Sequence, residues 1–327
     1  MGLMISAVIE CWPVNGEFII ARGAKTDVDV LVVAVCDGDY TGMGESTAIY
    51  YDGETAGRCL NQVMSVADQL HDMESMTAKQ AVQSLLPRGA ARNALDCALW
   101  DLAAQQAAMP LWQFAGLPQP KPLLTAFTIS LGEAGAMQAD AARAAEQGYR
   151  LLKLKLTGDG DAERVAAVRA GAPDARLIVD ANESWTGLDI AAEAQALADL
   201  GVEMVEQPLP HSDDGALARV TASLPLIADE SCHDAGDVVR CAHLYDGINI
   251  KLDKAGGLTE AIEMAHQARA AGLKIMSGCM LSTSLGIAPA FLLAQLADWV
   301  DLDGPALLAG DRDDAFRFAD GMILPPL

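Results

Sequence analysis

Five segments between residues 151 and 257 decide the fold: LLKLK (151–155), VDANESW (179–185), VEQPLP (205–210), IADES (227–231) and INIKLDKAGG (248–257). In each segment, a short apolar run typical of a buried strand ends at a charged residue. These residues are Lys155, Asp180, Glu206, Asp229 and Lys251. Their successive separations are 25, 26, 23 and 22 residues. Each charged residue therefore occupies the same position in a structural unit that repeats along the chain.

Alanine-rich segments with helical periodicity lie between these strands, and strict strand–helix alternation predicts a parallel sheet. Eight strands fit a closed barrel better than an open doubly wound sheet. No G-x-G-x-x-G motif follows the first strand, which argues against dinucleotide binding. We therefore predict an α/β fold, a modified (β/α)7β TIM-like barrel with no ordinary helix after strand eight. The expected strands are 124–130, 151–156, 177–180, 204–206, 226–229, 247–251, 274–277 and 299–302.

The first third of the chain has a different pattern. Residues 4–12, 29–36 and 40–45 have strand character, with turns at Asn15-Gly16 and Asp37-Gly38, and residues 90–107 have helical periodicity. The stretch GLPQPKP (116–122) reads as a linker. We expect an α+β capping domain over residues 1–120, a barrel over 121–304, and a tail, 305–327, that returns to the cap.

Composition excludes several classes of function. The 327 residues carry a formal net charge of −23 and no basic cluster, which disfavours binding to nucleic acid or to anionic membranes. The seven cysteines are an odd number without a C-x-x-C pair, so a disulfide framework is not expected. No signal peptide or membrane span is visible. We expect a cytoplasmic protein that acts on a small molecule, as a monomer or a homo-oligomer.

The strand ends predict a metal site. The carboxyl ends of barrel strands meet at one face, where catalytic groups gather, so Asp180, Glu206 and Asp229 should converge. Three close carboxylates repel one another unless a cation lies between them. All-oxygen ligation suits Mg²⁺, with Mn²⁺ as the alternative. Zinc fits less well because the five histidines are dispersed.

Two lysine strands flank the carboxylate strands. Lys155 and Lys251 would approach a substrate over the metal from opposite sides, which suits removal and return of a proton at one carbon. Lys153 shares a strand face with Lys155. The metal, Lys153 and partial desolvation should all disfavour the ammonium form of the bases.

Each residue alone has an ordinary explanation. Asp at a strand end is commonly a turn or cap residue, and Lys there is commonly a surface residue. Five charged groups in phase over consecutive units favour a shared site. Asp301 and Asp303 point to the same barrel face, although the following Gly304-Pro305 also fits a turn. Gly256-Gly257 fits either an anion-binding turn or a simple tight turn.

The segments Lys153-Leu-Lys155, Asp180-Ala-Asn, Glu206-Gln-Pro, Ala228-Asp-Glu-Ser and Asn249-Ile-Lys251 resemble the enolase superfamily, in its branch of muconate lactonising enzymes and dipeptide epimerases. The resemblance covers nearly the whole chain. It implies one Mg²⁺ per subunit on Asp180, Glu206 and Asp229, with Lys155 and Lys251 as the two bases. It further implies that Lys153 assists electrostatically beside the substrate carboxylate.

Within this branch, the segments IARG (20–23), AARNALDCALW (90–100) and DLDGP (301–305) resemble epimerases of L-Ala-D/L-Glu dipeptides. The resemblance implies that Asp301 and Asp303 bind the dipeptide α-ammonium group and that Arg22 meets the glutamate side chain, although Arg22 also fits a solvated loop. The implied reaction is a two-base 1,1-proton transfer through an enediolate, in murein peptide metabolism.

One residue departs from that pattern. Ser282, in GCMLST (278–283), stands where many relatives have Glu, and this weakens the inference about the substrate. Sister activities remain open: o-succinylbenzoate synthesis, muconate cycloisomerisation and N-acylamino acid racemisation. The aspartate pair argues against them, since their substrates lack a free ammonium group. A non-catalytic, metal-stabilised dipeptide-binding protein is the alternative from another class.

Overall fold

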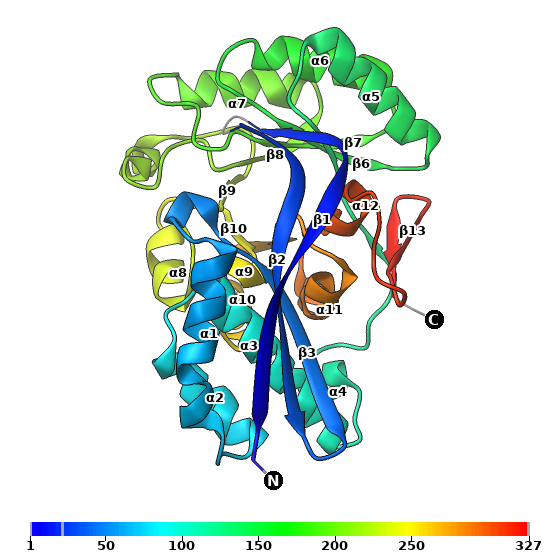
Figure 1. Ribbon diagram of the computed structural model, residues 1–327. Coiled ribbons are helices and arrows are strands. Elements are labelled where there is room, and N and C mark those ends of the chain that lie inside the picture. The colour runs from blue at the N-terminus through cyan, green and yellow to red at the C-terminus, as the bar shows by residue number, and fades with distance from the viewer. Residues whose placement is uncertain (1, 21–22, 326–327) are drawn as a thin grey trace.

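An antiparallel sheet and a parallel barrel make up the computed structural model, which describes residues 2–20 and 23–325 (Figure 1). The antiparallel sheet has the order β1 (Met4–Ile20), β2 (Gly23–Asp37), β3 (Tyr40–Thr47). The turn expected at Asn15-Gly16 does not end the first strand. A register shift between Pro13 and Phe18 accommodates Gly16 at φ +82°, and the strand continues. The β1–β2 ribbon therefore reaches the barrel, where the amide of Leu131 donates to the carbonyl of Ile19 at 3.0 Å.

The cap helices pack on this sheet. They are α1 (Ala56–Leu70), α2 (Ser75–Leu85), α3 (Ala90–Gln106) and α4 (Leu111–Phe114), preceded by the short 3₁₀ helix η1 (Tyr50–Asp52). Helix α3 is buried on almost every side and lies between the sheet and the barrel. It approaches β3 closely because Gly42 and Gly44 have no side chain; a Cβ at either position would overlap the α3 backbone.

The eight predicted barrel strands form one parallel sheet in sequential order, which confirms the barrel fold. They are β5 (Phe127–Ile129), β6 (Leu151–Lys155), β7 (Arg176–Asp180), β8 (Val202–Glu206), β9 (Leu226–Ala228), β10 (Gly247–Ile250), β11 (Lys274–Gly278) and β12 (Trp299–Asp301). The connecting elements are α5 (Ala134–Glu146), α6 (Asp161–Gly171), α7 (Ile190–Asp199), η2 (Asp214–Arg219), α8 (Ala235–Cys241), α9 (Leu252–Ala255), α10 (Leu258–Ala270), α11 (Ser284–Leu293) and η3 (Ala294–Leu296).

The first and last barrel strands meet at a seam with few hydrogen bonds. The amide of Ala126 donates to the carbonyl of Val300 at 2.8 Å. Side chains supply two further bonds: the amide of Leu302 donates to Thr125 Oγ1 at 2.9 Å, and the amide of Thr128 donates to Asp303 Oδ2 at 2.7 Å. The barrel is therefore nearly closed, and Asp303 helps to close it.

The barrel interior explains where the charged residues lie. A separate cluster of buried apolar side chains fills the end of the barrel opposite the carboxyl ends of the strands: Ala126, Leu151, Ile178, Met204, Ile227, Met276 and Trp299. On β6, β7, β8, β9 and β12 these residues precede the charged ones. Apolar packing therefore fills one end of the barrel and leaves the carboxyl end for polar groups.

The segment expected as one strand over 124–130 is divided in two. β4 (Leu123–Leu124) pairs with β14 (Met322–Leu324), which pairs with β13 (Arg317–Ala319), in a third small sheet. Before this sheet the tail forms α12 (Gly304–Leu307) and contacts the cap: Arg312 Nη2 lies 2.8 Å from Glu10 Oε2 and 2.6 Å from Glu45 Oε2. The tail therefore contacts both the cap and the barrel.

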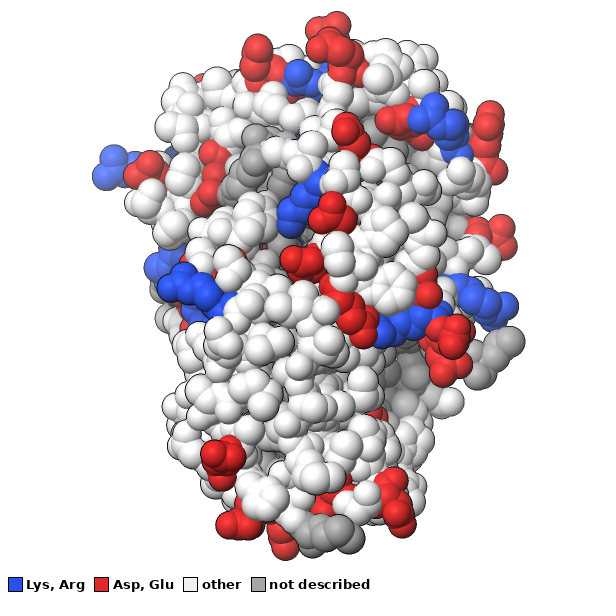
Figure 2. Space-filling model, in the orientation of Figure 1, with Lys and Arg blue, Asp and Glu red and all other residues white. Residues whose placement is uncertain are grey.

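On the face shown in Figure 2, most charged side chains lie in the upper and middle parts. A broad uncharged area lies below them, with further acidic side chains at the lower end. Lys and Arg side chains on this face are scattered among acidic ones and form no continuous basic patch. Within the described residues, no helix has the length and apolar character needed to cross a membrane.

Candidate active site

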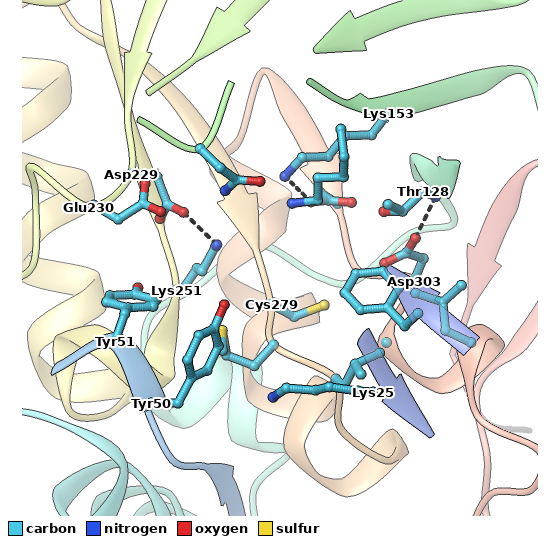
Figure 3. Close-up of a pocket in the computed structure, with 18 residues that line it drawn as sticks. Lys25, Tyr50, Tyr51, Thr128, Lys153, Asp229, Glu230, Lys251, Cys279 and Asp303 are labelled. Carbon is cyan, nitrogen blue, oxygen red and sulfur yellow. Dashed lines mark hydrogen bonds and ion pairs between the residues drawn. The ribbon is translucent and has the colours of Figure 1, made fainter. Parts of the chain in front are cut away.

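A pocket lies where the cap meets the carboxyl ends of the barrel strands (Figure 3). The cap contributes Phe18, Lys25, Tyr50 and Tyr51 to its lining. The barrel side contributes most of the predicted site residues: Lys153, Lys155, Asp229, Lys251, Asp301 and Asp303. Asp180 and Glu206 lie deeper and are fully buried. The structure therefore brings together every predicted site residue that it describes; Arg22 lies outside the described residues.

Lys153 is the centre of the acidic cluster. Its Nζ lies 2.6 Å from Glu206 Oε2, 2.8 Å from Asp301 Oδ2 and 3.2 Å from Asp180 Oδ2. Burial opposes the charged form, but attraction to these carboxylates outweighs it and raises the pKa of Lys153 well above its usual value. Lys153 is thus a fixed positive charge.

The other two lysines form separate pairs on the two sides of this cluster. Lys155 Nζ lies 2.7 Å from Asp180 Oδ2, and Lys251 Nζ lies 2.6 Å from Asp229 Oδ2. Strands β7, β8 and β9 separate the strands of the two lysines. Figure 3 shows Lys251 beside Asp229, across the pocket from Lys153 and Asp303. Lys155 and Lys251 are therefore not crowded on one flank.

The pKa values reflect this pairing. Burial alone would lower the pKa of Lys251, but Asp229 and Glu206 together raise it well above its usual value. The expected lowering of the lysine pKa values concerns a site that holds Mg²⁺, and it stays a prediction. Burial would raise the pKa of Asp180, but Lys155 and Lys153 hold it well below its usual range. Burial and then Asp180 raise the pKa of Glu206 to about 7.

The donor set fits a hard divalent cation in its chemistry. Three carboxylates from consecutive strands are at most 1% exposed, and Glu206 Oε2 accepts no well-aligned hydrogen bond. All the candidate ligand atoms are oxygens, as Mg²⁺ prefers. Among the residues described, no three acidic, histidine or cysteine side chains are arranged as a metal site. Each of the three carboxylates instead contacts an amine.

Asp301 and Asp303 form an acidic wall on the other side of the pocket. Asp301 Oδ2 is paired with Lys153, whereas Oδ1 has no hydrogen-bond partner among the described groups. Burial and then Asp301 raise the pKa of Asp303 to about 7. Asp303 is also the residue directly before the short helix α12. Its position therefore agrees both with a turn residue and with a residue that lines the pocket.

Sequence reasoning missed Lys25 and Lys254. Lys25 Nζ lies 4.5 Å from the centroid of the Tyr50 ring, and burial lowers the pKa of Lys25, opposed by Asp27. Lys254 is completely buried and contacts Asp229. A signal existed for Lys254, since it follows Lys251 by three residues at the start of a helix.

Gly256-Gly257 is a docking turn for the cap helix α3. Both glycines have positive φ, +84° and +119°, and a Cβ on either would overlap Arg92 or Asp96. Arg92 Nη2 donates to the carbonyl of Ala255 at 2.7 Å, and the amide of Thr259 donates to an Asp96 oxygen at 2.9 Å. The anion-binding interpretation is wrong, because cap side chains fill that space.

Ser282, the residue that departs from the family pattern, is buried at 3% exposure. Its hydroxyl donates to the carbonyl of Met280 at 3.3 Å. Met280 and Leu281 line the pocket, and Ser282 is not among the described lining residues. The serine therefore contributes to loop structure beside the pocket.

A capped barrel that gathers three buried carboxylates between two lysine-bearing strands defines the enolase class of enzymes. Models of known protein families match both parts of the chain. Residues 4–116 match the mandelate racemase / muconate lactonizing enzyme N-terminal domain, and residues 136–327 match the enolase C-terminal domain-like family. The chain belongs to the mandelate racemase / muconate lactonizing enzyme family of the enolase superfamily.

Several relatives are similar over nearly their whole length. The L-Ala-D/L-Glu epimerase of Escherichia coli K12 is 45% identical, over 96% of this chain and 97% of the relative. The N-acetyl-D-glutamate racemase of a Pseudoalteromonas species is 39% identical, over 90% and 93%.

Solved structures of related proteins have the same fold as this chain. An enolase family member from Agrobacterium tumefaciens with homology to dipeptide epimerases, with bound sodium and L-Ala-L-Glu, has a TM-score of 0.93 at 41% identity and covers 99% of this chain and 98% of that one. The dipeptide epimerase from Methylococcus capsulatus, complexed with Mg and L-Arg-D-Lys, has a TM-score of 0.92 at 30% identity, over 100% and 98%.

Proposed function

We propose that this protein is a Mg²⁺-dependent dipeptide epimerase that inverts the α-carbon of the C-terminal residue in L-Ala-D/L-Glu dipeptides. The observation that carries the proposal is the placement of Lys155 and Lys251 on opposite sides of three buried carboxylates. Two amines on opposite faces of one carbon can remove a proton from one side and return it from the other. The relatives named above support the class of reaction.

Asp180, Glu206 and Asp229 would hold the Mg²⁺. When bound, the ion supplies positive charge that stabilises negative charge developing on the substrate carboxylate. Lys153, fixed among Glu206, Asp301 and Asp180, adds a permanent ammonium group beside that carboxylate. General-base help gives roughly 10²–10⁴-fold, so this charge stabilisation must contribute a large share of the rate.

The acidic wall suits the other end of a dipeptide. Asp301 and Asp303 would accept hydrogen bonds from the α-ammonium group of the N-terminal residue, and charge-assisted bonds of this kind are roughly twice as strong as neutral ones. The unpartnered Oδ1 of Asp301 is one such acceptor. This end of the pocket favours a substrate with a free amine.

A cation from the cap would select the glutamate side chain. Lys25 lines the pocket and lies over the Tyr50 ring, so its amine is placed to pair with an acidic substrate side chain. Arg22, three residues earlier, remains a proposed second contact on the basis of family resemblance. The two cap cations would face the single side-chain carboxylate of L-Ala-L-Glu, and the two barrel aspartates would face its single ammonium group.

A second candidate activity is racemisation of N-acylated glutamate, favoured by the 39% identity to an N-acetyl-D-glutamate racemase. Such a substrate has the same carboxylate and α-proton but no ammonium group for the aspartates. The test is deuterium uptake at the glutamate α-carbon in D₂O, followed by NMR with Mg²⁺. L-Ala-L-Glu and L-Ala-D-Glu should exchange much faster than N-acetylglutamate. The reverse preference would overturn the dipeptide assignment.

The cellular setting and the domain limits belong to the same proposal. L-Ala-D/L-Glu dipeptides derive from murein, and the seven cysteines are free in the structure, which supports a reducing cytoplasm and cell-wall peptide recycling.

We propose the cap as residues 1–120 together with 305–327, and the barrel as 121–304. Contacts from Arg312 to Glu10 and Glu45 support this division.

A further inference from the structure

Lys254 is a charged side chain next to the site that is completely buried, with 0% exposure. Its Nζ donates to the carbonyl of Asp229 at 2.5 Å, to Asp229 Oδ1 at 2.6 Å and to the carbonyl of Asn249 at 3.0 Å. An ammonium group has three donors, so all three are used. None of these bonds points into the pocket, whose described lining does not include Lys254.

The contact divides the two oxygens of the Asp229 carboxylate between two amines. Oδ1 is bound by Lys254 from behind, and Oδ2 lies 2.6 Å from Lys251, which lines the pocket. Because Lys254 holds both Oδ1 and the backbone carbonyl of the same residue, rotation of the carboxylate would break a buried charged bond. Such a break costs more than loss of a surface pair.

We infer that Lys254 is a positioning residue that restricts Asp229 to presenting one oxygen, Oδ2, to a divalent cation in the pocket. The inference rests on the proposed function, in which Asp229 is one of three ligands. Lys254 touches neither substrate nor the reacting atoms and acts through Asp229. Outer groups that orient a metal ligand typically change metal affinity by about 10–100-fold when removed.

A purely structural role would predict something different. A buried amine needs compensating partners, and the backbone carbonyls of Asp229 and Asn249 could serve that need. In that case Lys254 would stabilise the β9–α9 region regardless of what stands at position 229. Coupling between Lys254 and the Asp229 carboxylate in metal binding therefore separates the two roles.

The experiment is a double-mutant cycle on Mg²⁺ affinity, measured by calorimetry without substrate. The proteins are the wild type, Lys254→Met, Asp229→Asn and the double variant, with thermal melting as the check on folding. We expect Lys254→Met to weaken Mg²⁺ binding at least about tenfold. The double variant should bind Mg²⁺ no more weakly than Asp229→Asn alone, because the amine then has no carboxylate to orient.

Lys79→Met is the matched control. Lys79 is also a buried lysine, at 6% exposure, but it lies in the cap over the Trp100 ring, 3.2 Å from its centroid. The Lys79→Met variant should be less stable than the wild type but should bind Mg²⁺ with unchanged affinity.

Several outcomes would overturn the inference: unchanged affinity in Lys254→Met, losses that add in the double variant, or failure of both Lys254 variants to fold. If Lys254→Met fails to fold but the double variant folds, the coupling is supported. A wild type that binds no Mg²⁺ refutes the proposed metal site itself, which is a separate result.

Discussion

Lys155 Nζ lies 2.7 Å from Asp180 Oδ2, so a proposed base and a proposed metal ligand are bonded to each other. Lys251 and Asp229 repeat this relationship on the other flank at 2.6 Å. Burial lowers the pKa of Lys251, but Asp229 and Glu206 together raise it well above its usual value. We therefore expect Lys251 to act as a base only when Asp229 has another cation to face.

Metal removal should therefore abolish the reaction rather than slow it modestly. After dialysis against EDTA, we expect α-proton exchange of L-Ala-L-Glu in D₂O to fall to background. Added Mg²⁺ should restore it, and Mn²⁺ should substitute. The protein should remain folded by circular dichroism, since the amines still neutralise the acids. Exchange that persists in metal-free enzyme would contradict the proposed role of the three carboxylates.

The two lysines should have separable stereochemical roles. We expect Lys155→Ala and Lys251→Ala each to abolish epimerisation, a loss of at least about 10²–10⁴-fold. Each variant can retain solvent exchange of one stereoisomer only, and the retained isomer should differ between them. NMR in D₂O with L-Ala-L-Glu and L-Ala-D-Glu measures this, with the exposed Lys121→Ala as control. Full epimerase activity in either variant would refute the two-base assignment.

Asp303→Asn tests recognition of the ammonium group with little structural disturbance. The asparagine side-chain oxygen can still accept the bond from the Thr128 amide, which Asp303 Oδ2 receives at 2.7 Å. The substitution removes the carboxylate charge and replaces one carboxylate oxygen with an amide NH₂ group. We expect kcat/KM for L-Ala-L-Glu to fall about tenfold or more, mostly through KM. Exchange of N-acetylglutamate, however slow, should not fall in parallel; an equal loss for both substrates would argue against an ammonium contact.

Lys25→Met should change selectivity for the substrate side chain. Because the amine lies in the pocket over Tyr50, its removal should lower kcat/KM for L-Ala-L-Glu about tenfold or more. L-Ala-L-Gln, the uncharged isostere, should change little. Kinetics with both dipeptides measure the ratio. A uniform loss for both would mean that Lys25 shapes the pocket without recognising the carboxylate.

Asp96, on the cap helix, should make stability fall as pH rises. Burial raises its pKa from 3.8 to about 6, against the bonds from Thr259 and the attraction of Lys79 and Arg92. The folded state therefore binds this proton more tightly than the unfolded state. Its contribution to stability is complete below about pH 3.8 and is lost as pH rises through about 6.

Asp96→Asn should remove this dependence. The free energy of unfolding of the variant relative to wild type should increase by about 2 kcal/mol between pH 4 and pH 7, since one pKa unit is worth ~1.4 kcal/mol. Urea unfolding at several pH values measures it. A constant difference between the two proteins across that range would show that Asp96 does not titrate as described.

The barrel and the convergence of its charges could be predicted because the information is local. An apolar run that ends in a charged residue and recurs every 22 to 26 residues specifies both the strand and the barrel face. The division of residues 124–130 could not be predicted, since Leu123–Leu124 pairs with a strand near residue 323. The position of Lys25 likewise depends on how the β1–β2 ribbon meets the barrel, which no local pattern encodes.

The sequence predicted which residues form the site, but it did not predict which contacts these residues make. That Asp180, Glu206 and Asp229 come together follows from strand order. That each is paired with a lysine follows from side-chain conformations and from the balance of burial against attraction. Gly256-Gly257 illustrates the limit: the positive φ angles were foreseeable, but the cap helix that fills the turn was not.

The seam between β5 and β12 links mechanical integrity to substrate choice. Asp303 faces the pocket and also accepts one of the few hydrogen bonds that join the two strands. A mutant library at residue 303 would therefore sample thermal tolerance and specificity together. Enzymes of this architecture that exchange the aspartate for a small or apolar side chain should need a compensating bond elsewhere along the junction, and Thr125, which already accepts from Leu302, is the place to look for it.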